Sequence, residues 1–135
     1  MPQRWLFKSD PEEYSFADLE SDGRTVWDGV SNNLALKNLR QVKLGDEILI
    51  YHSGGEKCLV GLAEALSDPF QDPSENDDKL VAVRIKAKRR FKKQLTLAEM
   101  KGLPGLSDFD LIRLPRLSVM PVTADQWKLI HDLVD

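Results

Sequence analysis

An aromatic residue followed by small polar residues is the feature of this sequence best suited to recognition chemistry. Trp27 precedes Gly29, and Ser31 and Asn32 come shortly after it. An indole can stack on a base that has left its helix, which is worth about 1–3 kcal/mol. An Asn amide both donates and accepts hydrogen bonds, so it can pair with the edge of a base. The residues alone leave two interpretations open: a ligand pocket, or a core tryptophan beside the N-cap of a helix.

Two other segments supply polar side chains near the ends of predicted strands. Lys8 and Ser9 close the first predicted strand, where a lysine can contact a phosphate or a base acceptor or can simply be solvated. Tyr51 and Ser53 end a later strand. Because side chains alternate along a strand, these two share one side, opposite to His52, and can form one wall of a cavity. The alternative is that they belong to a structural network that shapes the hairpin.

The most strongly charged segment covers residues 86–93, of which six in eight are basic. In the strand predicted over residues 80–90, apolar residues point to one side and the other side carries Arg84, Lys86, Lys88 and Arg90. No acid interrupts this basic face within the strand. It is therefore a candidate surface for phosphate contacts, which supply affinity without sequence specificity. The alternatives are a solvated face or an edge strand whose charge prevents aggregation.

Catalytic and metal-binding patterns are missing from the sequence. His52, His131 and Cys58 are not spaced like the ligands of a metal site, and no P-loop or nucleophile-elbow motif occurs. The carboxylates lie in predicted loops, away from the apolar surroundings that would raise a pKa. We therefore predict no catalysis, no metal and no cofactor. The remaining enzyme alternative is a small hydrolase that uses a Cys58–His52 dyad across a hairpin.

The composition is that of an ordinary globular domain. The 135 residues are 41% hydrophobic and 30% charged, with a net charge of −3, which suits one domain over residues 1–135. A single cysteine excludes an internal disulfide, and no apolar run is long enough for a signal peptide or a membrane span. We expect a protein of the cytoplasm, or of the nucleus in a eukaryote. The oligomeric state is left open.

Short strands mixed with short helices predict an α+β domain around a curled sheet or small barrel. The predicted strands cover residues 4–9, 25–27, 47–53, 58–66, 80–90 and 118–122. The predicted helices begin after the N-caps Ser15, Ser31 or Asn32, Thr96 and Thr123, and one more covers residues 109–114. The second helix is expected to reach Val42. A surface loop over residues 68–78 gathers the acids Asp68, Asp72, Glu75, Asp77 and Asp78.

Three segments, taken in their order along the chain, carry a resemblance to a known family. The first is WLFKSDPEEY at residues 5–14. The second begins with WDGVSN at residues 27–32 and continues through Gly45-Asp46, Tyr51-His52-Ser53 and Gly61-Leu62-Ala63. The third is RLSVMPVT at residues 116–123. Together they resemble the EVE domain family, and the resemblance covers nearly the whole chain.

The resemblance implies a PUA-like fold, with a curled mixed β-sheet or pseudo-barrel flanked by short helices, related to the YTH domains that bind N6-methyladenine in RNA. It also implies a nucleic-acid partner, DNA or RNA, with a modified cytosine or adenine held in an aromatic pocket and no catalysis. We expect this pocket to contain Trp27, Val30, Ser31, Asn32, Lys8, Ser9, Tyr51 and Ser53. The alternatives are a general RNA- or tRNA-binding module without base preference and a partner-binding adaptor.

This chain departs from the usual family pattern at three positions. Ser31 and Asn33 stand where relatives often carry Arg and Tyr, and Leu80 stands where many carry Trp. Any phosphate or stacking contact that those side chains make in relatives is therefore missing here. Arg116 and Ser118 match the family pattern, and we interpret Arg116 as a residue that fixes the C-terminal helix in place.

Overall fold

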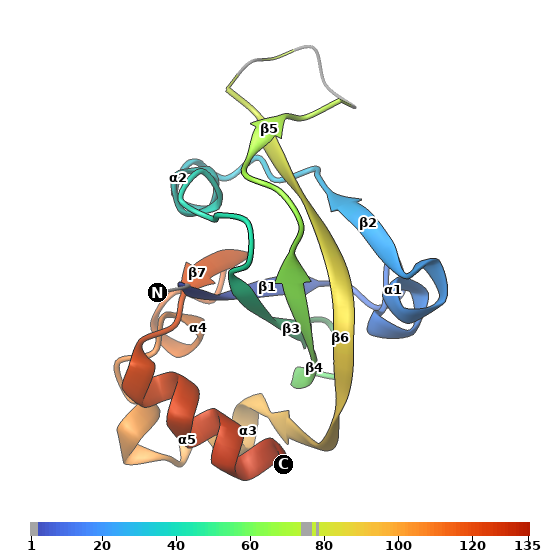
Figure 1. The fold of residues 1–135 in the computed structure, drawn as a ribbon. Helices are drawn as coiled ribbons and strands as arrows, with labels where there is room; N and C mark the ends of the chain where they lie inside the picture. Colours follow the sequence, from blue (N-terminus) through green and yellow to red (C-terminus); the bar gives the residue numbers. More distant parts are fainter. Residues whose placement is uncertain (1–2, 74–76, 78) are drawn as a thin grey trace.

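The computed structural model describes residues 3–73, 77 and 79–135, which form a curled mixed sheet with short helices packed around it (Figure 1). The strands are β1 (Arg4–Ser9), β2 (Arg24–Trp27), β3 (Glu47–His52), β4 (Cys58–Ala65), β5 (Phe70–Gln71), β6 (Val81–Thr96) and β7 (Val119–Pro121). The helices are α1 (Phe16–Asp22), α2 (Asn33–Leu39), α3 (Leu97–Lys101), α4 (Asp110–Arg113) and α5 (Ala124–Val134), with a 3-10 turn η1 (Pro104–Leu106). Glu75 and Asp78 of the predicted acidic loop lie outside the described residues.

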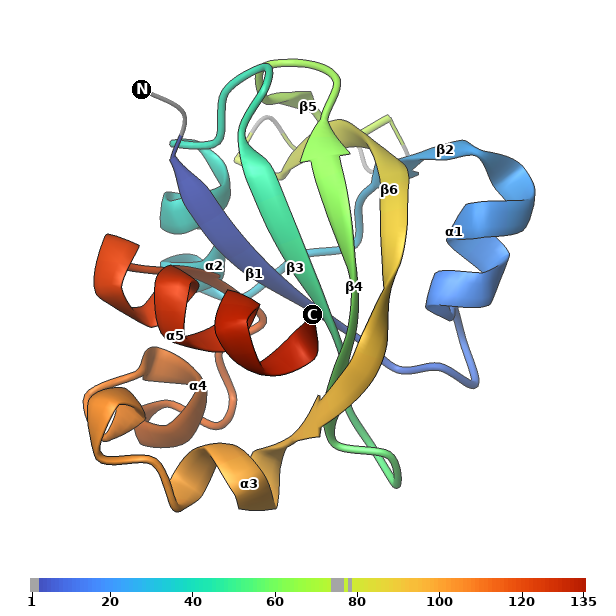
Figure 2. The same ribbon diagram turned by 60° about the horizontal axis from the view of Figure 1, so that its bottom comes forward.

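The sheet follows the order β2-β6-β4-β3-β1-β7, and β5 pairs with the start of β6. β1 runs parallel to β3 and antiparallel to β7. The strands of every other pair, β2–β6, β3–β4, β4–β6 and β5–β6, are antiparallel to each other. The register shifts between Ile50 and Tyr51 in the β3–β4 pair and at two places in the β4–β6 pair. Such bulges bend strands, and Figure 2 shows β6 curving along one side of the sheet. The predicted α+β fold with a curled mixed sheet is confirmed.

The N-caps predicted from the sequence are observed. Ser15, Asn32, Thr96 and Thr123 each accept a backbone N–H at the start of a helix, and it is Asn32, not Ser31, that caps α2. Helix α2 nevertheless ends at Leu39, before the predicted Val42. The amides of residues 41 and 42 bond to carbonyls three residues back, which makes a tight turn instead of α-helix.

Strand β6 continues to Thr96, beyond the predicted end at Arg90. The last part of β6 pairs with the start of β4, with Leu95 opposite Leu59. Phe91 and Leu95 are buried, so the strand gains apolar contacts that its many basic residues concealed in the sequence. None of the described helices has the length and apolar character that crossing a lipid bilayer requires.

Two hydrogen bonds draw distant segments together beside the end of β1. The backbone N–H of Lys8 donates to the carbonyl of Ser118 over 2.9 Å, which joins β1 to the segment that precedes β7. The N–H of Gly29 donates to the buried carboxylate of Asp72 over 3.0 Å, which fixes the loop after β2. Gly29 has a φ of 74°, so this loop uses a conformation that favours glycine. This loop leads directly into α2, so its position also sets where that helix begins.

Candidate functional site

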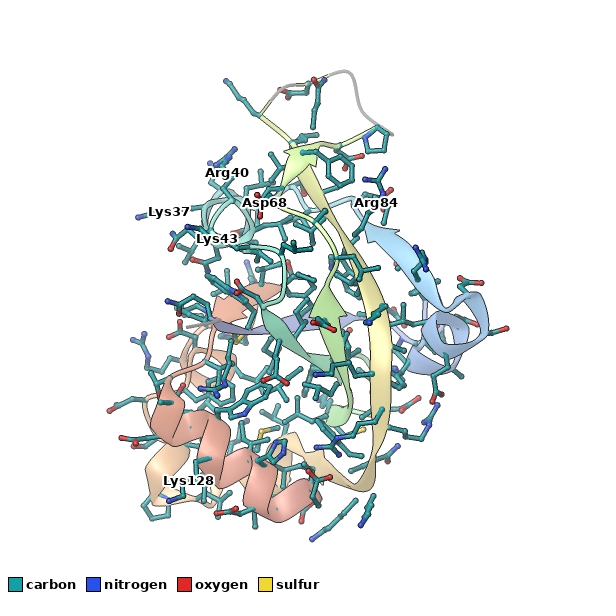
Figure 3. All side chains as sticks on the ribbon, in the orientation of Figure 1. Lys37, Arg40, Lys43, Asp68, Arg84 and Lys128 are labelled. Carbon is teal, nitrogen blue, oxygen red and sulfur yellow. The ribbon has the colours of Figure 1, made fainter. Side chains whose placement is uncertain are left out.

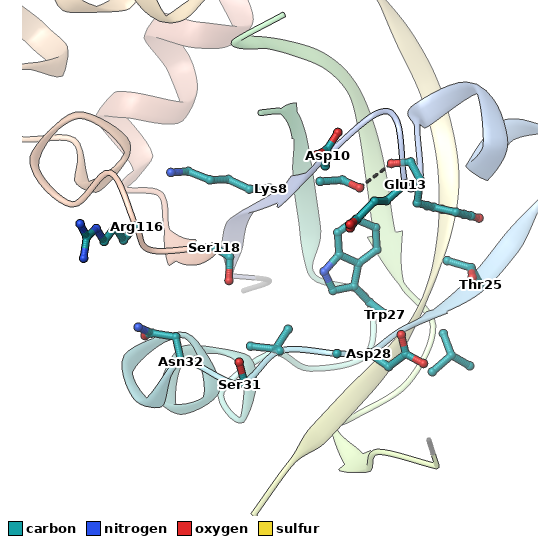
Figure 4. Close-up of a pocket in the computed structure, with 15 residues that line it drawn as sticks. Lys8, Asp10, Glu13, Thr25, Trp27, Asp28, Ser31, Asn32, Arg116 and Ser118 are labelled. Atoms are coloured by element: carbon teal, nitrogen blue, oxygen red, sulfur yellow. Dashed lines mark hydrogen bonds between the residues drawn. The ribbon is translucent and has the colours of Figure 1, made fainter. Parts of the chain in front are cut away.

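A pocket of about 910 Å³ opens where these segments meet. It contains six of the eight residues predicted for a base pocket: Lys8, Ser9, Trp27, Val30, Ser31 and Asn32. It also contains residues that the sequence analysis did not assign to it: Asp10, Glu13, Tyr14, Thr25, Val26, Asp28, Gly29, Arg116 and Ser118. Its walls come from β1, β2, the start of α2 and the segment before β7 (Figure 4).

Trp27 is both a packed residue and a wall of this pocket. Its exposed fraction is 9%, and Phe7 packs against the indole with ring centroids 5.5 Å apart and planes inclined by 39°. Tyr14 meets the indole edge-on at 6.4 Å. The edge that carries Nε1 faces the open space between Ser118 and Asn32 (Figure 4), and no described residue accepts its hydrogen. Trp27 therefore offers the pocket an indole edge and a free N–H donor.

Asn32 and Ser31 lie at the start of α2 with their side chains exposed. The Oδ1 atom of Asn32 accepts the N–H of Ala35 over 3.0 Å, so this oxygen serves as the helix cap. The Nδ2 group has no partner among the described residues and remains a donor for a ligand. Capping and binding are thus assigned to different atoms of one side chain.

Lys8 and Ser9 reach the pocket from the end of β1, and both are tethered. The Lys8 Nζ donates to the carbonyl of Pro115 over 2.7 Å and lies 5.9 Å from the ring centroid of Tyr51. Burial lowers the pKa of Lys8. The Ser9 hydroxyl donates to the carbonyl of Tyr14. An ammonium has three donor hydrogens, so Lys8 keeps hydrogen-bonding capacity for a ligand.

Three carboxylates line the opposite side of the pocket: Asp10, Glu13 and Asp28. Burial raises the pKa of Asp28, and the negative charge of Asp72 raises it further. Ionised carboxylates only accept hydrogen bonds, so this side suits a ligand that presents amino groups. In the sequence, Asp10 was visible only as the residue that ends a strand before Pro11. Its presence within the segment that resembles the family was the one available signal.

Tyr51 and Ser53 do not line the pocket, so the predicted shared wall is not formed. Strand β3 is an inner strand, paired with β1 and β4, and Tyr51 is packed within the sheet instead of facing the pocket. Tyr51 is buried, and this burial, with the nearby Cys58 thiol, raises its pKa to about 12. The Ser53 N–H donates to the carbonyl of Ser9. The alternative, a network that shapes the hairpin, describes both residues.

His52 and Cys58 show none of the geometry of a nucleophilic dyad. The His52 Nε2 accepts the backbone N–H of Phe16 over 3.0 Å, and Nδ1 lies 3.0 Å from Glu56 Oε1. Burial raises the pKa of the Cys58 thiol, and Glu56 raises it further. A raised pKa lowers the fraction of reactive thiolate. No three described His, Cys, Asp or Glu side chains are grouped so that they could hold a metal ion.

Three of the four basic residues that define the β6 face are paired with acids from neighbouring elements, which the strand's own sequence could not reveal. The Nζ atom of Lys86 lies 3.6 Å from Oε2 of Glu64, and the Nζ atom of Lys88 lies 3.5 Å from Oε2 of Glu47. Arg90 pairs with Glu20 of α1. No acid interrupts this face within β6 itself, and the pairing acids come from other elements. Phosphate contacts on this face stay a prediction.

The first two cations of β6 also point away from the pocket. Trp27 pairs with Val83, so the alternate residues Arg84 and Lys86 lie on the opposite face of the sheet. Arg84 stacks on Phe70 at 4.8 Å, beside β5 (Figure 3).

The family model for the EVE domain matches residues 3–133. The chain belongs to the EVE domain family. Thymocyte nuclear protein 1 of Rattus norvegicus is 32% identical to it, with 96% of this chain and 72% of the relative covered. The NMR structure of Rpa0253 from Rhodopseudomonas palustris is 37% identical, with a TM-score of 0.93 and coverage of 98% and 92%. The crystal structure of human THYN1 protein in complex with 5-methylcytosine-containing DNA is 28% identical, with a TM-score of 0.92 and coverage of 98% of each chain.

The comparisons confirm the family and the fold that the three sequence segments suggested. Apart from Thr25 and Val26, the residues of this EVE domain that form the pocket come from the first segment, the start of the second and the start of the third. The parts of the second segment around residues 51–53 and 61–63 instead lie in or beside β3 and β4. The resemblance therefore combined pocket residues with residues that build the sheet.

Proposed function

We propose that this EVE domain binds a nucleic acid and holds one modified base, a cytosine or an adenine, in the Trp27 pocket without catalysing a reaction. The observation that carries the proposal is the pocket beside Trp27 in a chain whose fold matches, over nearly its full length, a relative solved with 5-methylcytosine-containing DNA. A base inside a duplex is not accessible to such a pocket, so it must be extruded.

In this proposal, each pocket residue makes a different contact with the base. The indole edge of Trp27 contacts the base and its Nε1–H donates to an acceptor on it. Asn32 Nδ2 and the Ser31 hydroxyl donate to a second edge, while Lys8 supplies a positive donor. Ser9 and Val30 shape the wall, and the carboxylates accept hydrogen bonds from an exocyclic amino group.

The absence of catalysis in this proposal rests on the state of the reactive groups. The pocket contains neither His52 nor Cys58, and the Cys58 thiol is held protonated by its raised pKa. Lys8 is tied to the Pro115 carbonyl. These features favour a site that binds and releases its ligand unchanged.

Binding should be compared for matched oligonucleotides with 5-methylcytosine, 5-hydroxymethylcytosine, N6-methyladenine or no modification. We expect fluorescence anisotropy to show at least tenfold tighter binding, about 1.4 kcal/mol, for one modification. Equal affinities for all strands would favour the general RNA- or tRNA-binding alternative. Indifference to every DNA and RNA strand would overturn the proposal and favour the adaptor.

A pair of tryptophans tests the pocket assignment. We expect Trp27→Phe to weaken binding of the preferred oligonucleotide about tenfold, because phenylalanine lacks the Nε1 donor at the indole edge that contacts the base. Trp127→Phe is the matched control, since Trp127 has an exposed fraction of 7%, close to the 9% of Trp27, and lies on α5 outside the pocket. Thermal unfolding of both variants separates lost binding from lost folding. Equal affinity of the two variants would show that the pocket is misassigned.

A further inference from the structure

Arg116 is a pocket residue whose charge has no counter-charge in the part of the chain that the structure describes. Its side chain is exposed at the pocket, and no ion pair or hydrogen bond joins it to any residue that the structure describes. Three residues earlier, Arg113 is equally exposed to solvent but pairs with Asp110 at 2.7 Å and donates to the Asp108 carbonyl. The interpretation of Arg116 as a lock on the C-terminal helix therefore has no contact to support it.

The charges around the pocket are unevenly distributed. Arg116 and Lys8 lie on one side, and Asp10, Glu13 and Asp28 extend along the other (Figure 4). A nucleotide has the matching polarity, because its phosphate is anionic and the edge of its base is neutral. The carboxylates repel a phosphate, and an arginine fork binds one with two parallel hydrogen bonds.

A further cation lies on α2, the helix that packs against the segment after Arg116. The Asn38 Nδ2 of α2 donates to the Val119 carbonyl over 2.8 Å, which holds α2 against the segment that follows Arg116. Lys37, the next residue to Asn38, is exposed and projects outward from α2 (Figure 3). It forms no ion pair with a described residue. Lys37 is thus a second cation available to a bound strand. On β6, by contrast, five of the seven basic residues are paired with acids: Lys86, Lys88, Arg89, Arg90 and Lys93.

We propose that Arg116 binds the phosphate of the nucleotide whose base occupies the pocket and so fixes the direction in which that nucleotide enters. This inference rests on the proposed function, because it assumes a nucleic-acid ligand. It assigns the backbone contact to the C-terminal segment before β7 in place of the basic face of β6. Arg116 is then a positioning residue that contributes affinity without choosing the base.

The test compares Arg116→Ala with Arg113→Ala on modified and unmodified oligonucleotides over a range of salt concentrations. Loss of a phosphate contact should weaken both kinds of strand about tenfold and leave their affinity ratio unchanged. The slope of log K against log salt should become shallower by about 0.9 for a duplex or about 0.7 for a single strand. Arg113→Ala should bind like the wild type. Arg116→Lys should keep the slope and lose part of the affinity, since it keeps the charge without the fork.

Three results would overturn the inference while leaving the proposed function intact. In the first, the wild type prefers a modified strand and Arg116→Ala keeps its affinity and slope. In the second, Arg116→Ala abolishes the preference itself, which would place Arg116 on the base. In the third, Lys86→Ala with Lys88→Ala flattens the slope and Arg116→Ala does not, which would place the backbone on β6. A wild-type protein that binds no strand would instead refute the proposed function.

Discussion

Asn32 shows how one side chain can serve both the fold and the ligand. Its Oδ1 atom caps α2 through the Ala35 amide, while its Nδ2 group faces the pocket region without a described partner. From the sequence, this position was a candidate both for the N-cap of a helix and for a contact to the ligand. The structure makes them compatible, because an amide presents an acceptor and a donor at different atoms.

Substitution of Asn32 can therefore separate stability from binding. Aspartate caps helices about as well as asparagine, so Asn32→Asp should keep the free energy of unfolding within a few tenths of a kcal/mol, whereas Asn32→Ala should lose about 1 kcal/mol. Both variants lack the Nδ2 donor and should bind the preferred oligonucleotide about tenfold more weakly. Urea unfolding and anisotropy measure the two effects. Wild-type affinity in Asn32→Asp would show that the amide makes no contact with the base.

Single residues were predictable where their role is set by near neighbours in the chain. Ser15, Thr96 and Thr123 were found as helix caps because a cap depends on the residues that immediately follow it. The place of Arg116 in the pocket was missed, because the other walls lie 84 to 108 residues earlier in the chain. No local pattern distinguishes a free arginine from one that is paired, as Arg113 is with Asp110.

At the scale of the elements, the sequence predicted the existence of the strands more reliably than their ends. It also could not show which residues of other elements contact them. Strand β6 was expected to stop at Arg90, because its basic residues conceal the buried Phe91 and Leu95. The bulge before Tyr51 was equally invisible, because a register shift depends on both paired strands. The same limitation explains the β6 basic face, whose neutralising acids come from α1, β3 and β4.

Helix α1 is held against the sheet by a contact that permits only glycine on β4. A Cβ atom added at Gly61 would lie 2.4 Å from the ring of Phe16, which is fully buried. We expect Gly61→Ala to lower the free energy of unfolding by about 1–3 kcal/mol, because the overpacked ring must shift. Gly55→Ala is the matched control, since nothing lies within 4 Å of its added Cβ and its φ is unexceptional. Urea denaturation curves give both values.

The reason for the Gly61 effect can be checked with a second substitution. Phe16→Leu removes the ring atoms that the new methyl group would meet, so it should offset part of the loss in Gly61→Ala when the two are combined. Strictly additive losses would show that the glycine is required for the backbone and not for contact with α1.

At the scale of the whole molecule, the net charge of −3 means that attraction to nucleic acid must come from local features. Five basic residues of β6, Lys86, Lys88, Arg89, Arg90 and Lys93, are paired with acids and contribute little outward field. The available cations at the pocket are few, so few counterions are released on binding. We therefore attribute most of the affinity to the base in its pocket and a smaller part to phosphates.

This division of affinity predicts where a bound oligonucleotide will protect the protein from hydrogen exchange. The pocket walls come from residues 8–14, 25–32 and 116–118, which are distant in sequence and are joined only in the folded chain. A ligand at 100 times its Kd adds about 2.7 kcal/mol to the free energy of unfolding, so the thermal midpoint should also rise. Within seconds to minutes of exchange, the preferred oligonucleotide should slow the amides of these three segments together. The loop at residues 53–57 should exchange as in the free protein, because Ser53 does not reach the pocket.

Protection of residues 53–57 and 86–93 without the three pocket segments would place the ligand on the other face of the sheet and contradict both the pocket and the role of Arg116.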